Sequence, residues 1–152
     1  MRATIDFNFP KNELQKFDAT CQIAIQNVFR GTKKATEAAC QEILGESMAQ
    51  VPKETYTLLM SAYYEVARRG DTAVSTWTYE AIIGYGGNGD PINPITGRPA
   101  SSYMLAVHED TTAVHLNGKA KFLEDPVREY AASKFKRTVF KYAQESLASM
   151  SD

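Results

Sequence analysis

The sequence predicts an α+β protein in which helical segments flank an antiparallel β-sheet of three or more strands. Hydrophobic residues recur every three or four positions over residues 12–50, alternate over about 56–108, and return to helical spacing after Asp125. The resulting element order is α, β, β, β, α. The 152 residues suit a single domain over 1–152.

The composition excludes several classes of protein. With 17 Lys and Arg against 18 Asp and Glu, the net charge of −1 disfavours a protein whose whole surface binds nucleic acid. The sequence contains no run of about 18 apolar residues, so no transmembrane helix is predicted. Residues 1–17 carry charges where a secretory signal peptide requires an apolar stretch, so we expect a soluble cytoplasmic protein. Cys21 and Cys40 form neither a disulfide framework nor a zinc set.

The first element is a long helix over about 12–50. Asn12 and Gln15 have the spacing of a capping box at its start. Gly31 lies within the pattern and predicts a kink, because glycine costs a helix about 1 kcal/mol relative to alanine. Val51-Pro52 ends the helix, since the residue before proline avoids the α region. The apolar or small positions are Leu14, Phe17, Cys21, Ile25, Val28, Ala35, Ala39 and Ile43.

A long β-hairpin is predicted over about 57–85. Alternating apolar residues define a first strand from Leu58 to Val66 and a second from about Ala73 to Tyr85. Arg69-Gly70-Asp71 supplies the turn between them. Such a hairpin is marginal alone, so it needs a helix or further strands against one face.

A Gly- and Pro-rich loop over 86–100 and a third strand over about 103–108 follow the hairpin. The loop is too long and polar to bury a core, which leaves two interpretations, a disordered tip or a binding loop. The strand prediction rests on the short apolar run before His108.

The last element is a helix over about 125–148. Asp125 is a good N-cap residue, and Pro126 then occupies the favoured first position. Residues at helical spacing, Val127, Ala131, Phe135, Val139, Tyr142 and Leu147, form its apolar stripe. Its polar side carries Arg128, Lys134, Lys136, Arg137 and Lys141.

The residue pattern gives little support for catalysis. His108, Glu109 and His115 are residue types that bind zinc, but their spacing differs from the helical HExxH motif. No nucleophile elbow, Walker loop or dinucleotide fingerprint is present. We therefore expect no enzyme activity and no cofactor. A small metal-dependent enzyme using these three residues is the alternative from another class.

The C-terminal part of the chain is basic. Between residues 119 and 141, seven Lys and Arg residues stand against three Asp and Glu residues. A basic helix face binds phosphates or an acidic partner surface, or is simply solvated. The candidate partner or DNA contacts are Arg98, Lys134, Lys136, Arg137 and Lys141.

Two blocks of the sequence resemble a known family. Residues 51–61, VPKETYTLLMS, are similar to the V-P-x-D-T-G-x-L-x-x-S junction of phage head–tail joining proteins, with Tyr56 in place of the glycine. These are neck or tail-completion proteins of long-tailed phages, often labelled minor capsid proteins. Residues 103–124 resemble their Y-x-x-x-V-H-E … H-x-x-G-x-A-K-F-L-E block. The matching residues are Tyr103, Val107, His108, Glu109, His115, Gly118, Lys121, Phe122, Leu123 and Glu124.

The resemblance implies a structural virion protein. It implies a ring, sixfold or twelvefold, which joins the portal or adaptor side of the head to the tail-terminator side of the tail. A tail terminator or another capsid structural protein is the related alternative. The implied location is the virion neck, and the host cytoplasm during assembly, with passing contact to phage DNA and none to membranes. The second block then has a structural role, while the 86–100 loop, the hairpin edges and the helix faces contact neighbours.

Overall fold

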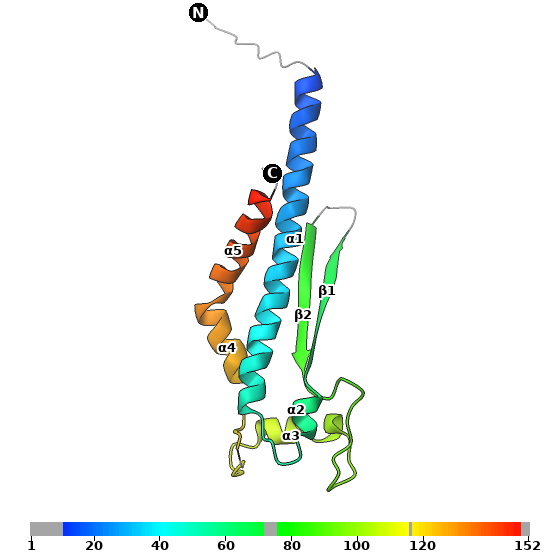
Figure 1. The fold of residues 1–152 in the computed structure, drawn as a ribbon, viewed down its shortest axis with the longest axis vertical. Helices are drawn as coiled ribbons and strands as arrows, with labels where there is room; N and C mark the ends of the chain where they lie inside the picture. The colour runs from blue at the N-terminus through cyan, green and yellow to red at the C-terminus, as the bar shows by residue number, and fades with distance from the viewer. Residues whose placement is uncertain (1–10, 72–75, 116, 150–152) are drawn as a thin grey trace, which may run out of the picture.

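The computed structural model describes residues 11–71, 76–115 and 117–149. A long helix runs the length of the molecule, with the two C-terminal helices along one side and a β-hairpin along the other (Figure 1). Short helices and the 86–100 loop lie together at the lower end of this view, which we call the base. The elements are α1 (Lys11–Gln50), α2 (Thr57–Met60), β1 (Tyr63–Asp71), β2 (Thr76–Gly84), a 3₁₀ helix (Ala100–Ser102), α3 (Met104–Glu109), α4 (Glu124–Ser133) and α5 (Phe135–Ala148).

Helix α1 confirms the predicted long helix but not the predicted kink. Its 40 residues form one continuous helix, about 60 Å long at 1.5 Å per residue. Gly31 instead lies directly against α5. A Cβ atom there would lie 2.6 Å from the Tyr142 carbonyl oxygen and 2.9 Å from Ser146 Oγ. The missing side chain therefore lets two helices pack, and the helix hydrogen bonds continue through it. Asn12 lies inside the helix, so it does not cap it.

The prediction of a sheet with three or more strands is wrong. The sheet in the described residues has two antiparallel strands, β1 and β2. Residues 57–60, predicted to begin the hairpin, form the single-turn helix α2, and β1 starts at Tyr63. The predicted turn at residues 69–71 belongs to β1, and the connection over 72–75 lies outside the described residues.

The predicted third strand is the short helix α3. Met104, Val107 and His108 are half-buried, whereas Leu105 and Ala106 are exposed, so burial follows helical spacing. Six residues with an apolar majority fit either a short strand or a helical turn. Helical spacing allows this segment to place Met104 and Val107 on the core.

One face of the hairpin lies against α1. The register places Tyr64 opposite Ile83 and Val66 opposite Ala81. Tyr64 contacts α1 directly, because its hydroxyl accepts a hydrogen bond of 3.0 Å from Gln41 Nε2. The hairpin thus gains the supporting helix that an isolated two-stranded sheet needs.

The predicted C-terminal helix is divided into α4 and α5, with Lys134 between them. Leu123, rather than Asp125, occupies the N-cap position of α4. Tyr130 is fully buried on α1, and its hydroxyl lies 2.8 Å from Thr138 Oγ1 on α5. Val127 belongs to the predicted apolar stripe but is exposed. Its side chain lines a shallow apolar groove beside α1 and β2.

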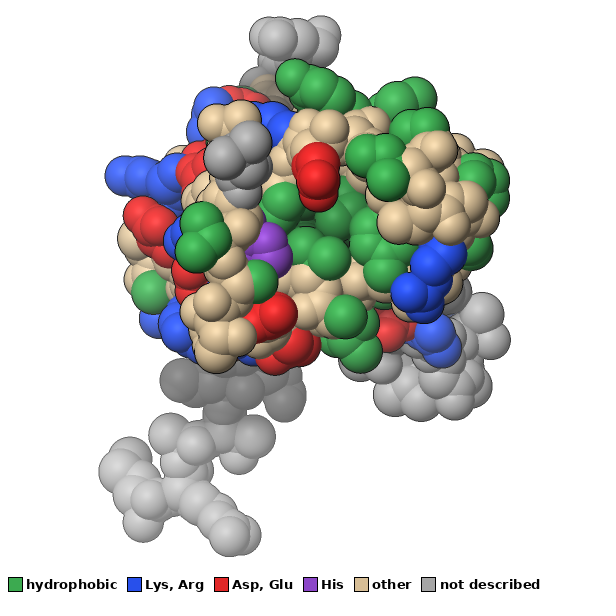
Figure 2. Space-filling view, turned by 90° about the horizontal axis from the view of Figure 1, so that it is seen from below, with side chains coloured by type: hydrophobic (Ala, Val, Ile, Leu, Met, Phe, Trp, Pro, Cys, Tyr) green, Lys and Arg blue, Asp and Glu red, His purple; other side chains and the backbone are tan. Residues whose placement is uncertain are grey.

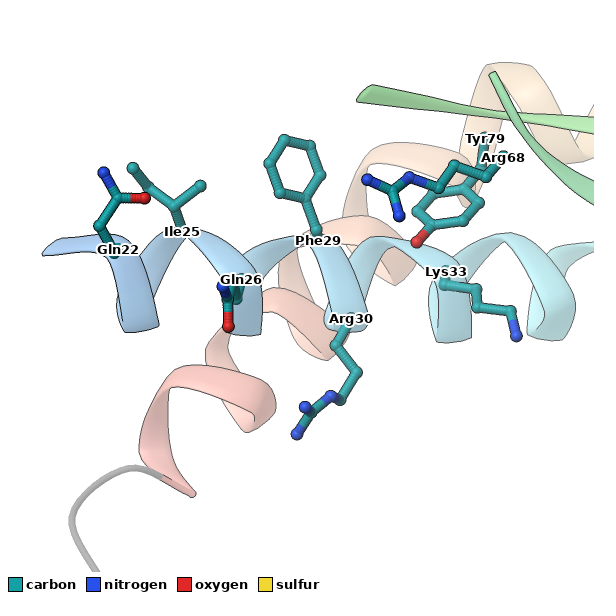
Figure 3. A pocket seen from close by; sticks show the side chains of 8 residues that line it. All are labelled: Gln22, Ile25, Gln26, Phe29, Arg30, Lys33, Arg68 and Tyr79. Carbon is teal, nitrogen blue, oxygen red and sulfur yellow. The ribbon is translucent and has the colours of Figure 1, made fainter. Parts of the chain in front are cut away.

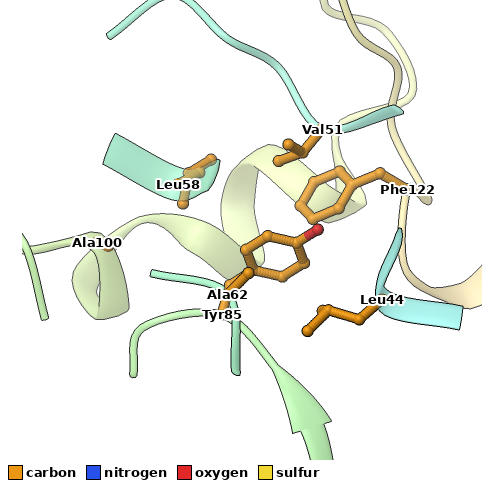
Figure 4. Packing of buried hydrophobic residues seen from close by; sticks show 7 residues of the cluster. All are labelled: Leu44, Val51, Leu58, Ala62, Tyr85, Ala100 and Phe122. Carbon is orange, nitrogen blue, oxygen red and sulfur yellow. The ribbon is translucent and has the colours of Figure 1, made fainter. Parts of the chain in front are cut away.

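The main core lies at the base, where segments distant in sequence meet (Figure 4). The rings of Tyr85 and Phe122 pack edge to face with centroids 5.1 Å apart. Ser47 Oγ lies 2.7 Å from the Tyr85 hydroxyl, which satisfies both buried groups. Burial raises the pKa of Tyr85 to about 12. The buried cluster consists of Leu44, Val51, Leu58, Ala62, Tyr85, Ala100 and Phe122. None of the described helices has the length and apolar character needed to cross a membrane.

Candidate functional site

The two sequence blocks singled out above meet at the base. The Lys119 backbone N–H donates to the Gln50 carbonyl at 2.9 Å. Gly118 packs so closely that a Cβ atom there would lie 2.5 Å from Pro52 Cα. Phe122 joins Val51 in the buried cluster. The base is therefore a junction at which the end of α1, α3 and the segment before α4 are held together.

Tyr56, in the first block, has a backbone conformation that is more usual for glycine. Its backbone has φ 58 and ψ −2, in the left-handed region that glycine adopts without strain. The chain therefore makes a left-handed turn at this position with a tyrosine, whose side chain is exposed to solvent.

The His108 ring connects α3 to the start of α4. Its Nε2 accepts a hydrogen bond of 3.3 Å from the backbone N–H of Glu124, the first residue of α4. Its Nδ1 lies 2.8 Å from Glu109 Oε1. Because a backbone N–H can only donate, the proton of the neutral ring belongs on Nδ1 and is donated to Glu109. The ring also packs edge to face on Phe122, with centroids 4.9 Å apart.

Alternating charges surround this histidine. Lys121 contacts the Glu109 carboxylate and lies 3.0 Å from Glu124 Oε2, and Glu124 also pairs with Arg128. The hydrogen bond from Lys121, followed by that from His108, holds the pKa of Glu109 below its usual value. The contacts of Lys121 with Glu109 and then with Glu124 raise the pKa of Lys121. These groups neutralise one another, as expected for a structural tie between segments.

We expect acid to loosen this junction. A carboxyl whose pKa is lowered by folding stabilises the folded state above its unfolded value, near 4.5 for Glu109. That contribution is lost as the pH falls below 4.5 and through the folded pKa. Urea unfolding between pH 7 and pH 3 should therefore show a smaller acid-dependent decrease in stability for Glu109→Gln than for the wild type.

The control for this prediction is Glu129→Gln, which changes an exposed carboxylate on α4. Its stability should follow the wild-type pH dependence. An identical acid dependence in Glu109→Gln and the wild type would contradict the role assigned to the Glu109 carboxylate.

The 86–100 loop has a defined structure. Asp90 accepts hydrogen bonds from the backbone N–H and hydroxyl of Ser101, and these hold the pKa of Asp90 below its usual value. Asn93 Oδ1 accepts from the N–H groups of Ile95 and Thr96 at 2.9 and 3.2 Å. Residues 92–99 thus form a tight turn closed by a β-bridge between Ile92 and Pro99, which favours the binding-loop interpretation over a disordered tip.

The arrangement of the histidines does not favour the metal-enzyme alternative. Both ring nitrogens of His108 already face protein partners, and His115 Nε2 lies 3.1 Å from the Asp110 backbone oxygen. Within the part of the chain that the structure describes, no three His, Cys, Asp or Glu side chains are grouped to hold a metal ion.

The basic residues predicted to contact a partner or DNA differ in whether they are already paired within the chain. Lys134, between α4 and α5, forms ion pairs with Glu42 and Glu46 of α1, which raise its pKa above the usual value. Lys134 therefore fastens the C-terminal helices to α1. The other candidates are exposed: Arg98 in the loop, and Lys136, Arg137 and Lys141 on α5.

Sequence reasoning missed two parts of this arrangement. The acidic partners of Lys134, Glu42 and Glu46, are four residues apart and so share one side of α1, a spacing that could have indicated a common partner. The buried pair of Ser47 and Tyr85 had no recognisable signal, because the two residues are 38 positions apart in sequence.

The base also carries an open apolar pocket. In the view from below, hydrophobic side chains gather on this end of the molecule, with a histidine among them (Figure 2). A pocket of about 290 Å³ lies between the end of the hairpin, α3 and the segment before α4. We call it the base pocket; among its lining residues are Ile83, Tyr85, Met104, Leu105, Glu109 and Phe122.

Comparisons with protein-family models, curated proteins and solved structures find no match for this chain.

Proposed function

We propose that the chain is a structural component of a phage neck, which assembles as a ring between head and tail. The observation that carries this proposal is the uncovered N-terminal half of α1. The first turns of α1 extend beyond both α5 and the described part of the hairpin (Figure 1). The exposed large hydrophobic residues of this half are Phe17, Ile23, Ile25 and Val28.

The bare surface of α1 continues a face that is buried lower down. Gly31 and Ala35 are buried, and Gly31 lies directly under α5. Toward the N-terminus, the same face of the helix continues through Val28 and Ala24 to Phe17. The Phe17 side chain is 69% exposed. A helix face of this apolar character is normally covered by another helix. Here α5 ends too early to cover it, which supports a neighbouring subunit as the cover.

A second uncovered feature lies on the adjoining face of α1. Ile25 and Phe29 point to the side on which the hairpin lies, near Tyr79 (Figure 3). They line a hollow of about 490 Å³, with Arg30 and Lys33 also in its wall. A hollow lined by apolar, amide and basic side chains fits a protein contact better than it fits a reaction centre.

The experiment is to determine the assembly state of the purified chain by native mass spectrometry and negative-stain electron microscopy. We expect closed rings, sixfold or twelvefold, and we expect the protein in virions of the phage whose genome encodes it. Phe17→Glu should reduce ring formation at least tenfold, because it places a charge in the proposed contact. Gln15→Glu adds a negative charge on the far side of the helix from Phe17, at a residue that is already exposed, and should leave the rings intact.

A strictly monomeric wild-type chain, or its absence from those virions, would contradict the proposal. Equal loss of rings in Phe17→Glu and Gln15→Glu would show that added charge alone is responsible, and would remove the N-terminal half of α1 as the contact.

A further inference from the structure

We infer that Asn117–Gly118 is a site of spontaneous deamidation, and that this modification loosens the junction at the base. The chain has two Asn-Gly dipeptides, at residues 88–89 and 117–118. Asparagine is thermolabile in proteins, above all before glycine, whose missing side chain lets its backbone nitrogen approach the asparagine side chain. The fold restrains the first dipeptide and leaves the second one open. The inference concerns the single chain and does not depend on ring assembly.

The reaction uses atoms of the dipeptide itself together with water. The backbone nitrogen of Gly118 attacks Cγ of Asn117 and gives up its proton, and the side-chain nitrogen leaves as ammonia. Water then opens the resulting cyclic imide. Opening at the side-chain carbonyl gives aspartate. Opening at the main-chain carbonyl gives isoaspartate, in which the main chain runs through Cβ and is longer by one carbon, about 1.5 Å.

Asn88 is restrained by hydrogen bonds on both sides. Its side-chain Nδ2 donates to the Ala62 carbonyl at 2.6 Å. The backbone N–H of Gly87 donates to the Ser61 carbonyl at 3.0 Å, and that of Asp90 donates to the Gly87 carbonyl at 2.9 Å. Cyclisation requires Cγ of the asparagine to lie within about 3–3.5 Å of the glycine nitrogen, in an aligned geometry. Asn88 has to break its hydrogen bond to Ala62 before it can reach that geometry.

Asn117 lacks this restraint. Its side chain is exposed and forms no hydrogen bond with any residue that the structure describes. Residues 109–114, which precede it, are also exposed, so movement there disturbs no buried side chain. The attacking nitrogen of Gly118 gives up only a long hydrogen bond, 3.4 Å, to the His115 carbonyl. Local opening of an exposed segment of this kind requires little free energy.

The junction at the base begins directly at this dipeptide. A Cβ atom on Gly118 would lie 2.5 Å from Pro52 Cα, and the Lys119 N–H donates to the Gln50 carbonyl at 2.9 Å. Both contacts depend on the length of the chain at residues 117–119. An isoaspartate at 117 adds one carbon to the main chain where close packing leaves no space for it. The modified chain should therefore hold the end of α1 less firmly to the segment before α4.

The first measurement follows deamidation of the full-length chain by mass spectrometry of proteolytic peptides. After incubation for several weeks at mildly alkaline pH and body temperature, Asn117 should have reacted at least about tenfold faster than Asn88, with isoaspartate among its products. The control is the same incubation in urea, because unfolding removes the hydrogen bonds of Asn88. Both sites should then react at similar rates.

Two results of this measurement would overturn the inference. One is a folded chain in which Asn88 reacts as fast as Asn117 or faster. The other is a difference between the two sites that persists unchanged in urea, since it would then come from the neighbouring sequence and not from the fold.

The second measurement tests the effect on the base. Wild-type chain incubated until most of Asn117 has reacted should unfold at a lower urea concentration than fresh chain. The matched variant is Asn117→Gln, because glutamine cyclises far more slowly. After the same incubation, this variant should keep the urea midpoint of its own fresh sample. An unchanged midpoint in the wild type, with isoaspartate present at residue 117, would show that the junction tolerates the longer chain and would overturn the proposed loosening.

Discussion

Replacing Gly31 by alanine should destabilise the protein, although alanine is the better helix former. The added Cβ would lie 2.6 Å from the Tyr142 carbonyl oxygen and 3.0 Å from the Ala143 Cα, closer than atoms in a folded protein approach. Because both are backbone atoms, α5 has to move away from α1. Overpacking of this kind costs about 1–3 kcal/mol.

The same substitution elsewhere in α1 provides the control. Gly45 is exposed, and a Cβ atom there would meet no atom within 4 Å. Gly45→Ala should therefore increase the free energy of unfolding by about 1 kcal/mol through helix propensity alone. Both variants gain this propensity term, so the difference between them isolates the steric cost at Gly31, about 1–3 kcal/mol.

Urea unfolding followed by circular dichroism measures both variants at one fixed protein concentration. A Gly31→Ala variant as stable as Gly45→Ala would show that α5 does not pack on α1 at this residue. Loss of this packing would also expose the α1 face below Val28, so we expect Gly31→Ala to form irregular assemblies more readily than the wild type.

The second large effect is expected at Phe122. Its side chain is 1% exposed and packs edge to face on both Tyr85 and His108. Phe122→Ala removes this ring from the junction and leaves a cavity, at a cost of about 3–5 kcal/mol. Since domains of this size are stable by about 5–15 kcal/mol, this loss is a large fraction of the total free energy of unfolding.

Phe140→Ala is the matched control for Phe122→Ala. The chemical change is identical, but Phe140 is 65% exposed on α5. Its free energy of unfolding should change by no more than about 0.5 kcal/mol. A similar loss of stability in both variants, measured by urea unfolding, would contradict the placement of Phe122 at the centre of the base.

Both predictions concern how segments distant in sequence are held together. Gly31 joins α5 to the middle of α1, and Phe122 joins three segments at the base. The neighbour contact proposed for the bare end of α1 uses other residues. Phe17→Glu should therefore change assembly without disturbing the packing of these segments, which makes that variant interpretable.

The strongest periodic patterns in the sequence did determine local structure. The 40-residue helix, the alternating hairpin strands and the helical C-terminus all follow from spacing, because each buries one continuous face over several turns or residue pairs. The hydrophobic spacing of short segments did not distinguish a helix from a strand. Residues 57–60 and 104–109 are helical although alternation predicted strands, since four to six residues satisfy both periods nearly equally.

The members of the junction were named from the sequence, but their roles came from the tertiary structure. Asp125, predicted as the N-cap of the last helix, pairs instead with Lys119 at 2.7 Å, while the His108 ring receives the helix N–H at Glu124. Lys134, a candidate DNA contact, is committed to two carboxylates of α1. Each outcome depends on a partner far away in sequence.

The sequence alone determined the helices with long repeats, the near-neutral charge and the residues of the two blocks, 51–61 and 103–124. Tertiary structure decided the number of strands, the straight path of α1 through Gly31 and the meeting of the two blocks at the base. The physical reason is that hydrophobic period is a local property of the chain. Close backbone approach, as at Gly31, and ion pairing, as at Lys134, arise only when folding brings distant segments together.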